Sequence, residues 1–505
     1  MAKAIMVQGT ASNAGKSLLT AALCRIFKRD GYRVAPFKSQ NMALNSFITA
    51  DGFELGRAQA MQAEAAGIPP DVRMNPVLLK PTGDTGSQVV LMGKPVGTMP
   101  ATDYYAYKRE LRPKIEEAYA SLATEYDIIV IEGAGSPAEI NLKHDDFVNM
   151  GMAKIAKAPV LLVGDIDRGG VFASLYGTVE LVDEDERALI KGLIINKFRG
   201  DVELLRPGLK QIEELTHKPV LGVVPMTRVD IDDEDSLSER LRHSVPGSAG
   251  SIDIAVIRLP RLSNFTDFAP FERLSGVTLR YVGAVTELGR PDMVILPGSK
   301  STMEDLHWLR DNGLERAIKL FAENGGIVFG VCGGYQMMGR TLSDPDGVES
   351  GGEMTGIGLL PVETVFRGEK TTVQVTGHFE HTDGVFAPLG GALLEGYEIH
   401  MGDSVSDTPL IRLSRNGENI ADGAFLGNCG GTYVHGLFDS AEVTAAFMSI
   451  LARRRGFEFN SGDIENSREY KERQYEILAD AVEAALDMDA VYRILNDGIE
   501  VHDGL

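Results

Sequence analysis

The stretch "KAIMVQGTASNAGKSLLTAALCRIF", residues 3–27, decides the fold of the N-terminal half of the chain. A short apolar run is followed by a glycine-containing loop at 9–17 and then by a segment with helical periodicity. This order of strand, loop and helix is the context that a phosphate-binding loop requires. Backbone N–H groups of such a loop, together with the helix N-terminus, can hold phosphate oxygens. The stretch therefore predicts a nucleotide-binding α/β domain.

The predicted nucleotide site follows the pattern of this loop. Five residues separate Gly9 from Gly15, one more than in the common form, so Thr10 stands where the first glycine usually falls. Lys16 is expected to neutralise the β- and γ-phosphates of ATP, and Ser17 is expected to hold Mg²⁺. The predicted ATP-binding residues are Gly9, Thr10, Asn13, Gly15, Lys16, Ser17, Lys38 and Asn196.

Further polar side chains follow the predicted strands of this domain. Glu132 and Asp165 end the runs "YDIIVIEG" and "APVLLVGD", and we expect both to hold Mg²⁺ together with Ser17. The alternative for Glu132 is a surface acid at a strand end. Lys38 contacts phosphate or an acyl phosphate, or is simply solvated. Asn196 reads the nucleotide base with its amide, or is a turn residue.

The order of apolar runs predicts the domain organisation. Continuous rather than alternating runs are typical of buried parallel strands, and helical segments separate several of them, which predicts a doubly wound, mostly parallel sheet. A polar insertion at 40–100 interrupts this pattern, and an acidic run followed by a Pro/Gly/Ser cluster at 230–250 predicts a boundary. The predicted domains are 1–235, a second α/β domain at 251–445 with antiparallel strands beyond 355, and a helical C-terminal extension at 446–505.

Composition narrows the functional classes. The chain has 505 residues, a formal net charge of −22 and a pI of about 4.9, which disfavours general binding to nucleic acid. Its three cysteines show no metal-ligand spacing, and no apolar run approaches the roughly 20 residues that span a bilayer. The N-terminus has no apolar core of a signal peptide. We therefore expect a cytoplasmic protein that is not bound to membranes and that can form a homo-oligomer.

A second candidate site lies in "GIVFGVCGGYQMMG", residues 326–339. Cys332 follows an apolar run and is flanked by glycines, which is the form of a nucleophile on a sharp strand-to-helix turn. The Gly333 N–H is then free to point at an oxyanion, and a helix N-terminus lowers the pKa of a thiol. The alternative is a buried structural cysteine. Cys24 is expected to pack in the core, and Cys429 is expected to lie in a turn.

A nucleophilic thiol needs a base, and His435 in "GGTYVHGLF" (430–438) is the candidate. His400 is a weaker candidate for lining the site. His378 and His381, three apart on a predicted strand, would point to opposite faces, so a metal site there is not expected. These residues predict a Cys332–His435 pair.

Several motifs carry a resemblance to known families. The loop at 8–17 resembles that of dethiobiotin synthetase, which activates a carboxylate with ATP, and "IEGAGS" (131–136) fits the same comparison. Residues 330–336 resemble class I glutamine amidotransferases, which implies that Gln336 lines the glutamine pocket. "LPGS" (296–299) resembles the second oxyanion-hole loop of that family, which implies that Gly298 or Ser299 donates an N–H. The family usually places Glu two residues after the histidine, where this chain has Leu437. Asp439 and Glu398 are the candidates to replace it.

The combination resembles the cobyric acid and cobyrinic acid a,c-diamide synthases. "SQNMALNS" (39–46), "MNPVLLKPTGDTGSQVV" (74–90), "EGAGSPAEINL" (132–142), "DIDRGGVFAS" (165–174), "INKFRGD" (195–201), "LPGSKST" (296–302) and "GYEIHMG" (396–402) resemble the cobyric acid synthase branch. This resemblance implies amidation of the b, d, e and g carboxylates of adenosylcobyrinic acid a,c-diamide with ATP, Mg²⁺ and L-glutamine. Acyl phosphates and ammonia from glutamine would be the intermediates.

The polyanionic corrinoid that the resemblance implies makes three basic residues candidate substrate contacts. They are Lys80, Lys143 and Arg168, and each could equally be a surface charge. Three alternatives stay open at this point. They are the a,c-diamide synthase, a P-loop ATPase switch, and a scaffold with an inactive amidotransferase domain.

Overall fold

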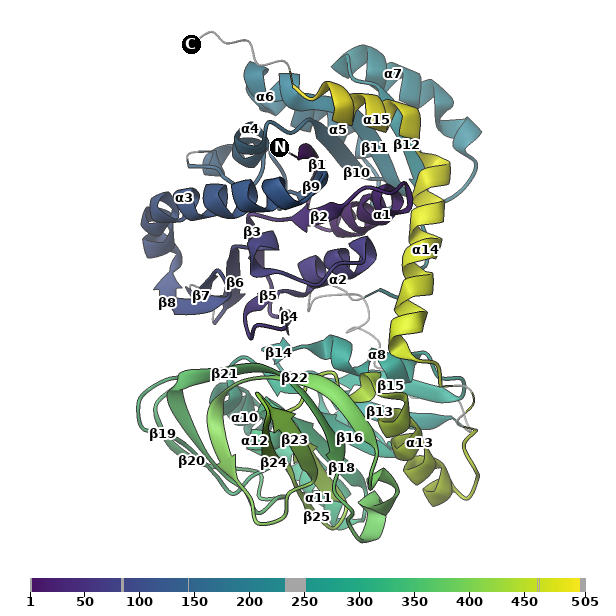
Figure 1. The fold of residues 1–505 in the computed structure, drawn as a ribbon. Coiled ribbons are helices and arrows are strands. Elements are labelled where there is room, and N and C mark those ends of the chain that lie inside the picture. Colours follow the sequence, from purple (N-terminus) through teal and green to yellow (C-terminus); the bar gives the residue numbers. More distant parts are fainter. Residues whose placement is uncertain are drawn as a thin grey trace. The chain divides into compact units, whose positions relative to one another are not determined.

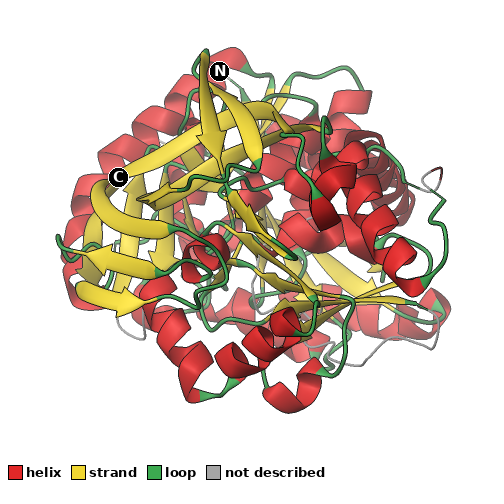
Figure 2. Cartoon of the chain, turned by 90° about the horizontal axis from the view of Figure 1, so that it is seen from below, coloured by secondary structure: helices red, strands yellow, loops and turns green. Residues whose placement is uncertain are grey.

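The computed structural model describes residues 2–82, 86–143, 145–231, 251–460, 462 and 464–499. Residues 232–250, which include most of the predicted domain boundary, lie outside the described residues. The chain divides into two compact units. The first unit comprises residues 1–42, 55–232 and 471–505, and the second unit comprises residues 43–54 and 233–470. Figure 1 labels the elements of both, and Figure 2 shows helices lying against the sheets.

A six-stranded parallel sheet forms the centre of the first unit, in the order β12-β11-β10-β1-β9-β2. The prediction of buried parallel strands is confirmed, because the strands coincide with the continuous apolar runs. They are β1 (Lys3–Gly9), β2 (Val34–Phe37), β9 (Ile128–Glu132), β10 (Val160–Asp165), β11 (Ile190–Phe198) and β12 (Val220–Pro225).

The strand order places the candidate nucleotide residues at one edge of this sheet. After β1, the chain first forms β2 and β9 on one side of β1, and only later forms β10, β11 and β12 on the other side. β1 therefore lies at the topological switch point of the sheet. Ligands of such sheets bind outside the carboxyl ends of the strands at this point. The helices of this unit are α1 (Lys16–Arg29), α2 (Arg57–Ala66), α3 (Ala101–Glu125), α4 (Met150–Ala156), α5 (Val171–Leu181), α6 (Glu184–Leu189) and α7 (Arg206–Thr216).

The predicted insertion at 40–100 is folded. A small sheet runs in the order β3-β6-β7-β8, and β4 pairs with β5 in a two-stranded ribbon. These strands are β3 (Gln40–Met42), β4 (Ser46–Ile48), β5 (Glu54–Gly56), β6 (Val77–Pro81), β7 (Gly86–Leu91) and β8 (Lys94–Pro100). The strands are short and separated by turns, which explains why the sequence shows no clear periodicity here.

The C-terminal helices are shared between the two units, whereas the sequence predicts one separate extension at 446–505. Helix α13 (Ala441–Arg455) belongs to the second unit, whereas residues 471–505, with most of α14 (Ser467–Ala485) and all of α15 (Met488–Asp497), belong to the first. Buried Tyr475 and Val482 of α14 pack in the core that includes α1. Figure 1 draws α14 and α15 in yellow. Arg25 of α1 also binds Glu472 at 2.6 Å.

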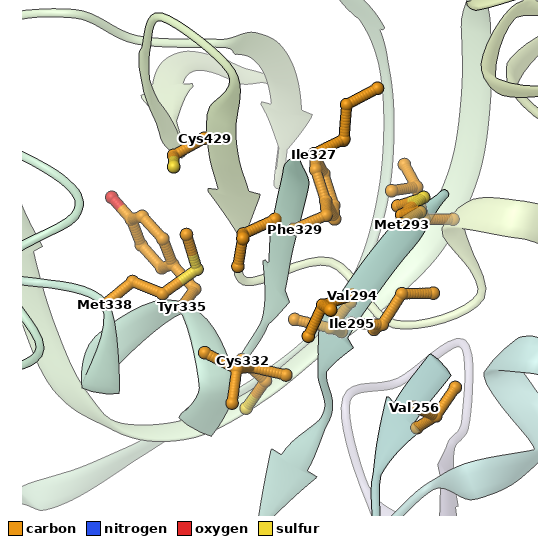
Figure 3. Close-up of a cluster of buried hydrophobic side chains, with 14 of the residues drawn as sticks. Val256, Met293, Val294, Ile295, Ile327, Phe329, Cys332, Tyr335, Met338 and Cys429 are labelled. Carbon is orange, nitrogen blue, oxygen red and sulfur yellow. The ribbon is translucent and has the colours of Figure 1, made fainter. Parts of the chain in front are cut away.

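A second, mostly parallel sheet forms the centre of the second unit, in the order β15-β13-β16-β18-β26-β25. Its strands are β13 (Ile252–Ile257), β15 (Val277–Val282), β16 (Met293–Leu296), β18 (Ile327–Val331), β25 (Ala424–Leu426) and β26 (Cys429–Thr432). Figure 3 shows buried side chains of β13, β16, β18 and β26 with Cys332 in the same cluster. The helices are α8 (Ala269–Glu272), α9 (Val285–Leu288), α10 (Thr302–Asp311), α11 (Leu314–Glu323) and α12 (Gly333–Met337).

A largely antiparallel sheet follows, as the alternation beyond 355 predicts. It runs β20-β19-β21-β23-β24, and β22 also pairs with β21. Its strands are β19 (Thr341–Asp344), β20 (Gly352–Thr355), β21 (Glu363–Phe379), β22 (Leu393–Val405), β23 (Ile411–Arg415) and β24 (Glu418–Asp422). Cys429 begins β26, so its prediction as a turn residue is wrong. No helix among the described residues is long and apolar enough to span a membrane.

Candidate active site

Cys332 lies on a sharp turn between β18 and α12. Its backbone has φ 50° and ψ −110°, a left-handed region that L-residues rarely occupy and that costs about 1–3 kcal/mol. The Cys332 N–H donates to the Thr432 carbonyl at 2.8 Å, so the turn is fixed to the neighbouring strand. Strain of this kind persists only where the surrounding structure imposes it. The geometry is that of a nucleophile on a strand-to-helix turn, with a side chain that is buried.

His435 is held by a carboxylate that the sequence did not indicate. Its Nδ1 lies 2.6 Å from Oδ2 of Asp267, and the Gly436 N–H donates to Oδ1 of Asp267 at 3.1 Å. Asp267 lies in the 3₁₀ helix Phe265–Phe268, far from His435 in the sequence. With Nδ1 engaged, Nε2 is the ring atom that can exchange a proton with Cys332. Cys332, His435 and Asp267 therefore form a triad.

The electrostatics of this triad favour an imidazolium. Burial lowers the pKa of His435, but the negative charges of Asp267 and Cys332 and their hydrogen bonds to the ring raise it more, to about 10. An opposite charge within a few ångströms stabilises the charged form of an imidazole. The site therefore holds a protonated His435 beside Cys332 at neutral pH.

The two acids suggested as partners of His435 occupy other places. Asp439 is exposed at the end of the 3₁₀ helix Leu437–Asp439. Glu398 is buried and faces Nε2 of His400 at 3.6 Å and Arg415 at 3.4 Å. Both suggestions are therefore wrong, because Asp267 already binds Nδ1. Leu437 is buried in the core of the second unit.

The "LPGS" loop lies beside His435 and beside Gly333, the residue that follows Cys332. A Cβ built on Gly298 would lie 3.0 Å from Cε1 of His435, and one built on Gly333 would lie 2.8 Å from the Ser299 nitrogen. Gly298–Ser299 forms β17, which pairs with β14 (Leu262–Ser263). The structure therefore brings the three predicted oxyanion-hole residues beside Cys332 and His435.

Gln336 lies within a buried polar network. Its Oε1 accepts from Thr302 Oγ1 at 3.1 Å, and its Nε2 donates to Tyr433 Oη at 3.1 Å. The His400 ring stacks on the Tyr433 ring with 3.7 Å between centroids. His400 thus lies near Gln336, as its assignment to the site requires. The Tyr433 N–H also donates to Oδ2 of Asp422 at 3.3 Å, and burial raises the pKa of Asp422 to about 6.

The loop between β1 and α1 is shaped by Gly15. This residue has φ 91°, and a Cβ at this position would lie 2.1 Å from Nδ2 of Asn196, so only glycine fits. Lys16 Nζ donates to the carbonyls of Ala11 at 3.0 Å and Gly135 at 3.1 Å. The Lys16 ammonium therefore lies over the loop that is expected to bind phosphate.

The remaining residues of this loop are held by main-chain bonds. The Thr10 N–H donates to the Val163 carbonyl at 2.9 Å. Asn13 has a positive φ of 59°, which is typical of a turn. The Asn13 carbonyl accepts from Lys197. Gly9 ends β1, and a Cβ there would lie 3.0 Å from Lys16 Nζ. All of these positions belong to one turn around Lys16.

Glu132 is the centre of the candidate metal site. Its carboxylate is buried and accepts from Ser17 Oγ at 2.8 Å, Lys38 Nζ at 2.9 Å and Gln62 Nε2 at 2.5 Å. Glu132 is therefore not a surface acid, and Lys38 is not solvated. Sequence reasoning missed Gln62, because nothing in the pattern of α2 links it to β9.

The oxygens of Ser17 and Glu132 fit Mg²⁺, which usually takes one or two protein oxygens and completes its shell with phosphate and water. Among the described residues, no three His, Cys, Asp or Glu side chains converge as a metal site. Asp165 is engaged by Lys197 Nζ at 3.0 Å and by the Asp167 N–H at 2.8 Å.

Asn196 and the candidate substrate contacts have defined positions. Asn196 lies within β11 rather than in a turn, and its amide donates to the Ala14 carbonyl at 2.9 Å. Lys80 is buried on β6, and Arg168 is exposed. Lys143 pairs with Glu186 at 3.0 Å and with Asp183 at 3.1 Å. Of the three basic residues, only Arg168 is fully at the surface.

Comparison with known proteins identifies a known family for each of the two domains. Residues 5–237 match the family model of the CobQ/CobB/MinD/ParA nucleotide binding domain, and residues 253–443 match that of the CobB/CobQ-like glutamine amidotransferase domain. The chain is 61% identical to the cobyric acid synthase of Ruminiclostridium cellulolyticum over 99% of this chain and 98% of the relative. It belongs to the cobyric acid synthase family.

Two other relatives give the same result across the whole chain. Identity is 54% to the cobyric acid synthase of Lachnoclostridium phytofermentans, over 99% of this chain and 100% of the relative. It is 53% to that of Listeria monocytogenes, over 98% of this chain and 97% of the relative. As a member of the cobyric acid synthase family, the chain carries both the nucleotide-binding and the glutamine amidotransferase domains. The recognition and the fold class predicted from the sequence are confirmed.

Proposed function

We propose that this chain makes adenosylcobyric acid by amidating the b, d, e and g carboxylates of adenosylcobyrinic acid a,c-diamide. ATP phosphorylates each carboxylate, and ammonia from glutamine displaces phosphate from the acyl phosphate. The observation that carries this proposal is the Cys332–His435–Asp267 triad on the same chain as a phosphate-binding loop. Membership of the cobyric acid synthase family supports the identity of the acceptor.

Glutamine hydrolysis begins with the Cys332 thiolate. It attacks the side-chain amide carbon of glutamine, and the N–H groups of Gly333 and of Gly298 or Ser299 stabilise the oxyanion that forms. The His435 imidazolium protonates the departing ammonia, which leaves a thioester on Cys332. His435 then deprotonates the water that hydrolyses this thioester to glutamate. Gln336 lies beside the nucleophile and orients the substrate.

The nucleotide site activates the acceptor carboxylate. Lys16 and the loop N–H groups hold the phosphates of ATP, while Ser17 and Glu132 would hold Mg²⁺, which would neutralise charge on the transferred phosphoryl group. Lys38 and Gln62 fix the Glu132 carboxylate from two sides. Asp165 is a further candidate at the end of the adjacent strand β10, and Asn196 supports the loop. Lys80 and Arg168 are the candidate contacts of the acidic corrinoid.

We predict that Lys16→Ala lowers amidation with either nitrogen source on the order of 100-fold, because a charged hydrogen-bond donor to phosphate is lost. Amide formation is measured with saturating ammonium, so that the glutaminase makes no contribution. Lys210→Ala, which removes an exposed lysine of the same unit, is the control and should have no effect. Normal turnover of the Lys16 variant would refute the ATP site.

The experiment that tests the whole proposal is mass spectrometry of the corrinoid product. Adenosylcobyrinic acid a,c-diamide is incubated with enzyme, ATP, Mg²⁺ and glutamine. Addition of four amides is the expected result, since the proposal assigns amidation to the b, d, e and g carboxylates. In a parallel incubation with cobyrinic acid, addition of only two amides, together with no amidation of the a,c-diamide, would identify the a,c-diamide synthase instead. Absence of any amide product would favour the ATPase switch or a scaffold.

A further inference from the structure

A short segment with an unusual placement lies next to the triad. Ala43–Glu54 groups with the second unit, although the residues on both sides of it in the sequence belong to the first. It contains β4 and is continuous with β5. Its sequence, "ALNSFITADGFE", carries no catalytic motif. The segment is therefore an insertion from the first unit whose role in the amidotransferase unit needs an explanation.

Polar bonds fix the segment to the antiparallel sheet. Thr372 Oγ1 donates to the Gly52 carbonyl at 2.7 Å, and the Gln374 amide donates to the Ile48 carbonyl. Lys370 Nζ pairs with Glu54 at 2.5 Å, and both side chains are buried. Breaking such a buried pair is costly. Residues 43–54 are therefore a built part of the second unit.

Tyr397 links the segment to His435. Its Oη donates to the Ser46 carbonyl at 3.2 Å, and its ring stacks on the His435 ring with 5.4 Å between centroids. The backbones of Tyr397 and His435 exchange two hydrogen bonds, at 3.1 Å and 2.9 Å. The Phe47 ring packs on Tyr397 at 5.8 Å. The position of the His435 imidazole therefore depends on a residue that the segment holds.

The segment also reaches the residues that support Cys332 and Asp267. Ile48 packs with Tyr397 and Ile399 in one buried cluster, and the Ile399 carbonyl lies 3.7 Å from Cys332 Sγ.

On the Asp267 side, the Ser46 N–H donates to Oδ1 of Asn264 at 3.2 Å. Asn264 in turn accepts from the Asp267 N–H at 3.1 Å. One segment thus contacts the immediate neighbours of all three triad residues.

The two flanks of the segment meet at the nucleotide site. Lys38, shortly before Ala43, donates to Oε1 of Glu132, and Gln62, shortly after Glu54, donates to Oε2 of the same carboxylate. Within the first unit, a movement of the Glu132 carboxylate therefore affects both Lys38 and Gln62, the residues that flank the segment in the sequence. Binding of a nucleotide with Mg²⁺ at Ser17 and Glu132 would cause such a movement.

We propose that residues 43–54 are a coupling segment that positions Tyr397, and through it His435, according to the state of the nucleotide site. The proposal rests on the proposed function, because it assigns regulation to the same two sites. Tyr397 is a positioning residue, because it acts through the His435 ring on which it stacks. Occupation of the nucleotide site shifts the triad toward its productive geometry, so that ammonia is released when an acyl phosphate can form. Coupling between sites is typically 5- to 150-fold.

The test uses the full-length protein and measures the kcat of glutamate release from glutamine, with and without ATP and Mg²⁺. ATP and Mg²⁺ are expected to raise this kcat by at least about 5-fold in the unmodified enzyme. Tyr397→Phe removes the bond to Ser46 but keeps the ring, and Thr372→Val removes the bond to Gly52. Both variants should lose most of the response to ATP while amidation with ammonium stays normal.

The matched control is Thr408→Val. It also removes a hydroxyl bond to a main-chain carbonyl of the second unit, that of Phe425 at 3.0 Å, but lies outside the segment. It should respond to ATP as the unmodified enzyme does. An unmodified enzyme whose glutaminase ignores ATP, or a Tyr397→Phe variant with an unchanged response, would overturn the coupling proposal and leave the proposed function intact. Absence of glutamate release under every condition would overturn both.

Discussion

Cys332→Ala is expected to abolish glutamine-dependent amidation while high ammonium still supports it. The substitution removes the only thiol held beside His435 among the described residues, so no thioester forms and glutamate release falls by more than about 1,000-fold. The nucleotide site is untouched, and free ammonia replaces the product of the lost reaction. The two rates are measured as amide formation from glutamine and from ammonium with the same acceptor.

Cys429→Ala is the matched control for this substitution. Cys429 is a buried cysteine of the same unit, and burial raises its pKa to about 11, so it carries little thiolate. Its loss should leave glutamate release within a few-fold of the unmodified enzyme. Retained glutamine use in the Cys332 variant would refute the nucleophile, and loss of both activities would indicate that the substitution damages the fold.

Local features of the chain were predictable because each depends on neighbouring residues. The parallel strands are continuous apolar runs, since both faces of such a sheet are buried. The turn at Cys332 is marked by glycines on either side, and the loop at Lys16 is marked by Gly15, which alone fits against Asn196. In both turns, the glycines that mark the turn in the sequence lie in the same strand–turn–helix unit as the residue that they position.

Features that depend on distant parts of the chain were not predictable. Asp267 reaches His435 across 168 positions, and no spacing rule connects an acid in a 3₁₀ helix with that histidine. The same holds for Gln62 at Glu132 and for α14 on α1. One signal for Asp267 did exist: Leu437 at the usual acid position required an acid from elsewhere. The sequence offered many acids and no means to rank them.

Asp267→Asn should reduce glutamate release on the order of 1,000-fold at neutral pH, with little loss of amidation from ammonium. The charge of Asp267 helps to raise the pKa of His435 to about 10 against the effect of burial. An amide at position 267 removes this charge, so the imidazolium is lost at a lower pH. An amide NH₂ facing Nδ1 would also favour the tautomer with a proton on Nε2, which cannot accept one from Cys332.

The pH profile separates this explanation from a loss of structure. Because the imidazolium must persist to hold the thiolate and protonate ammonia, the alkaline limb of glutaminase activity should lie near pH 10 in the unmodified enzyme. In Asp267→Asn, it should move down toward the ordinary histidine pKa of about 6.5. Asp439→Asn makes the same chemical change at an exposed acid near His435 and should leave the profile in place. If Asp439→Asn shifted the profile instead, Asp439 and not Asp267 would be the acidic partner of His435. An unshifted profile in Asp267→Asn would show that the Asp267 charge does not set the imidazole pKa.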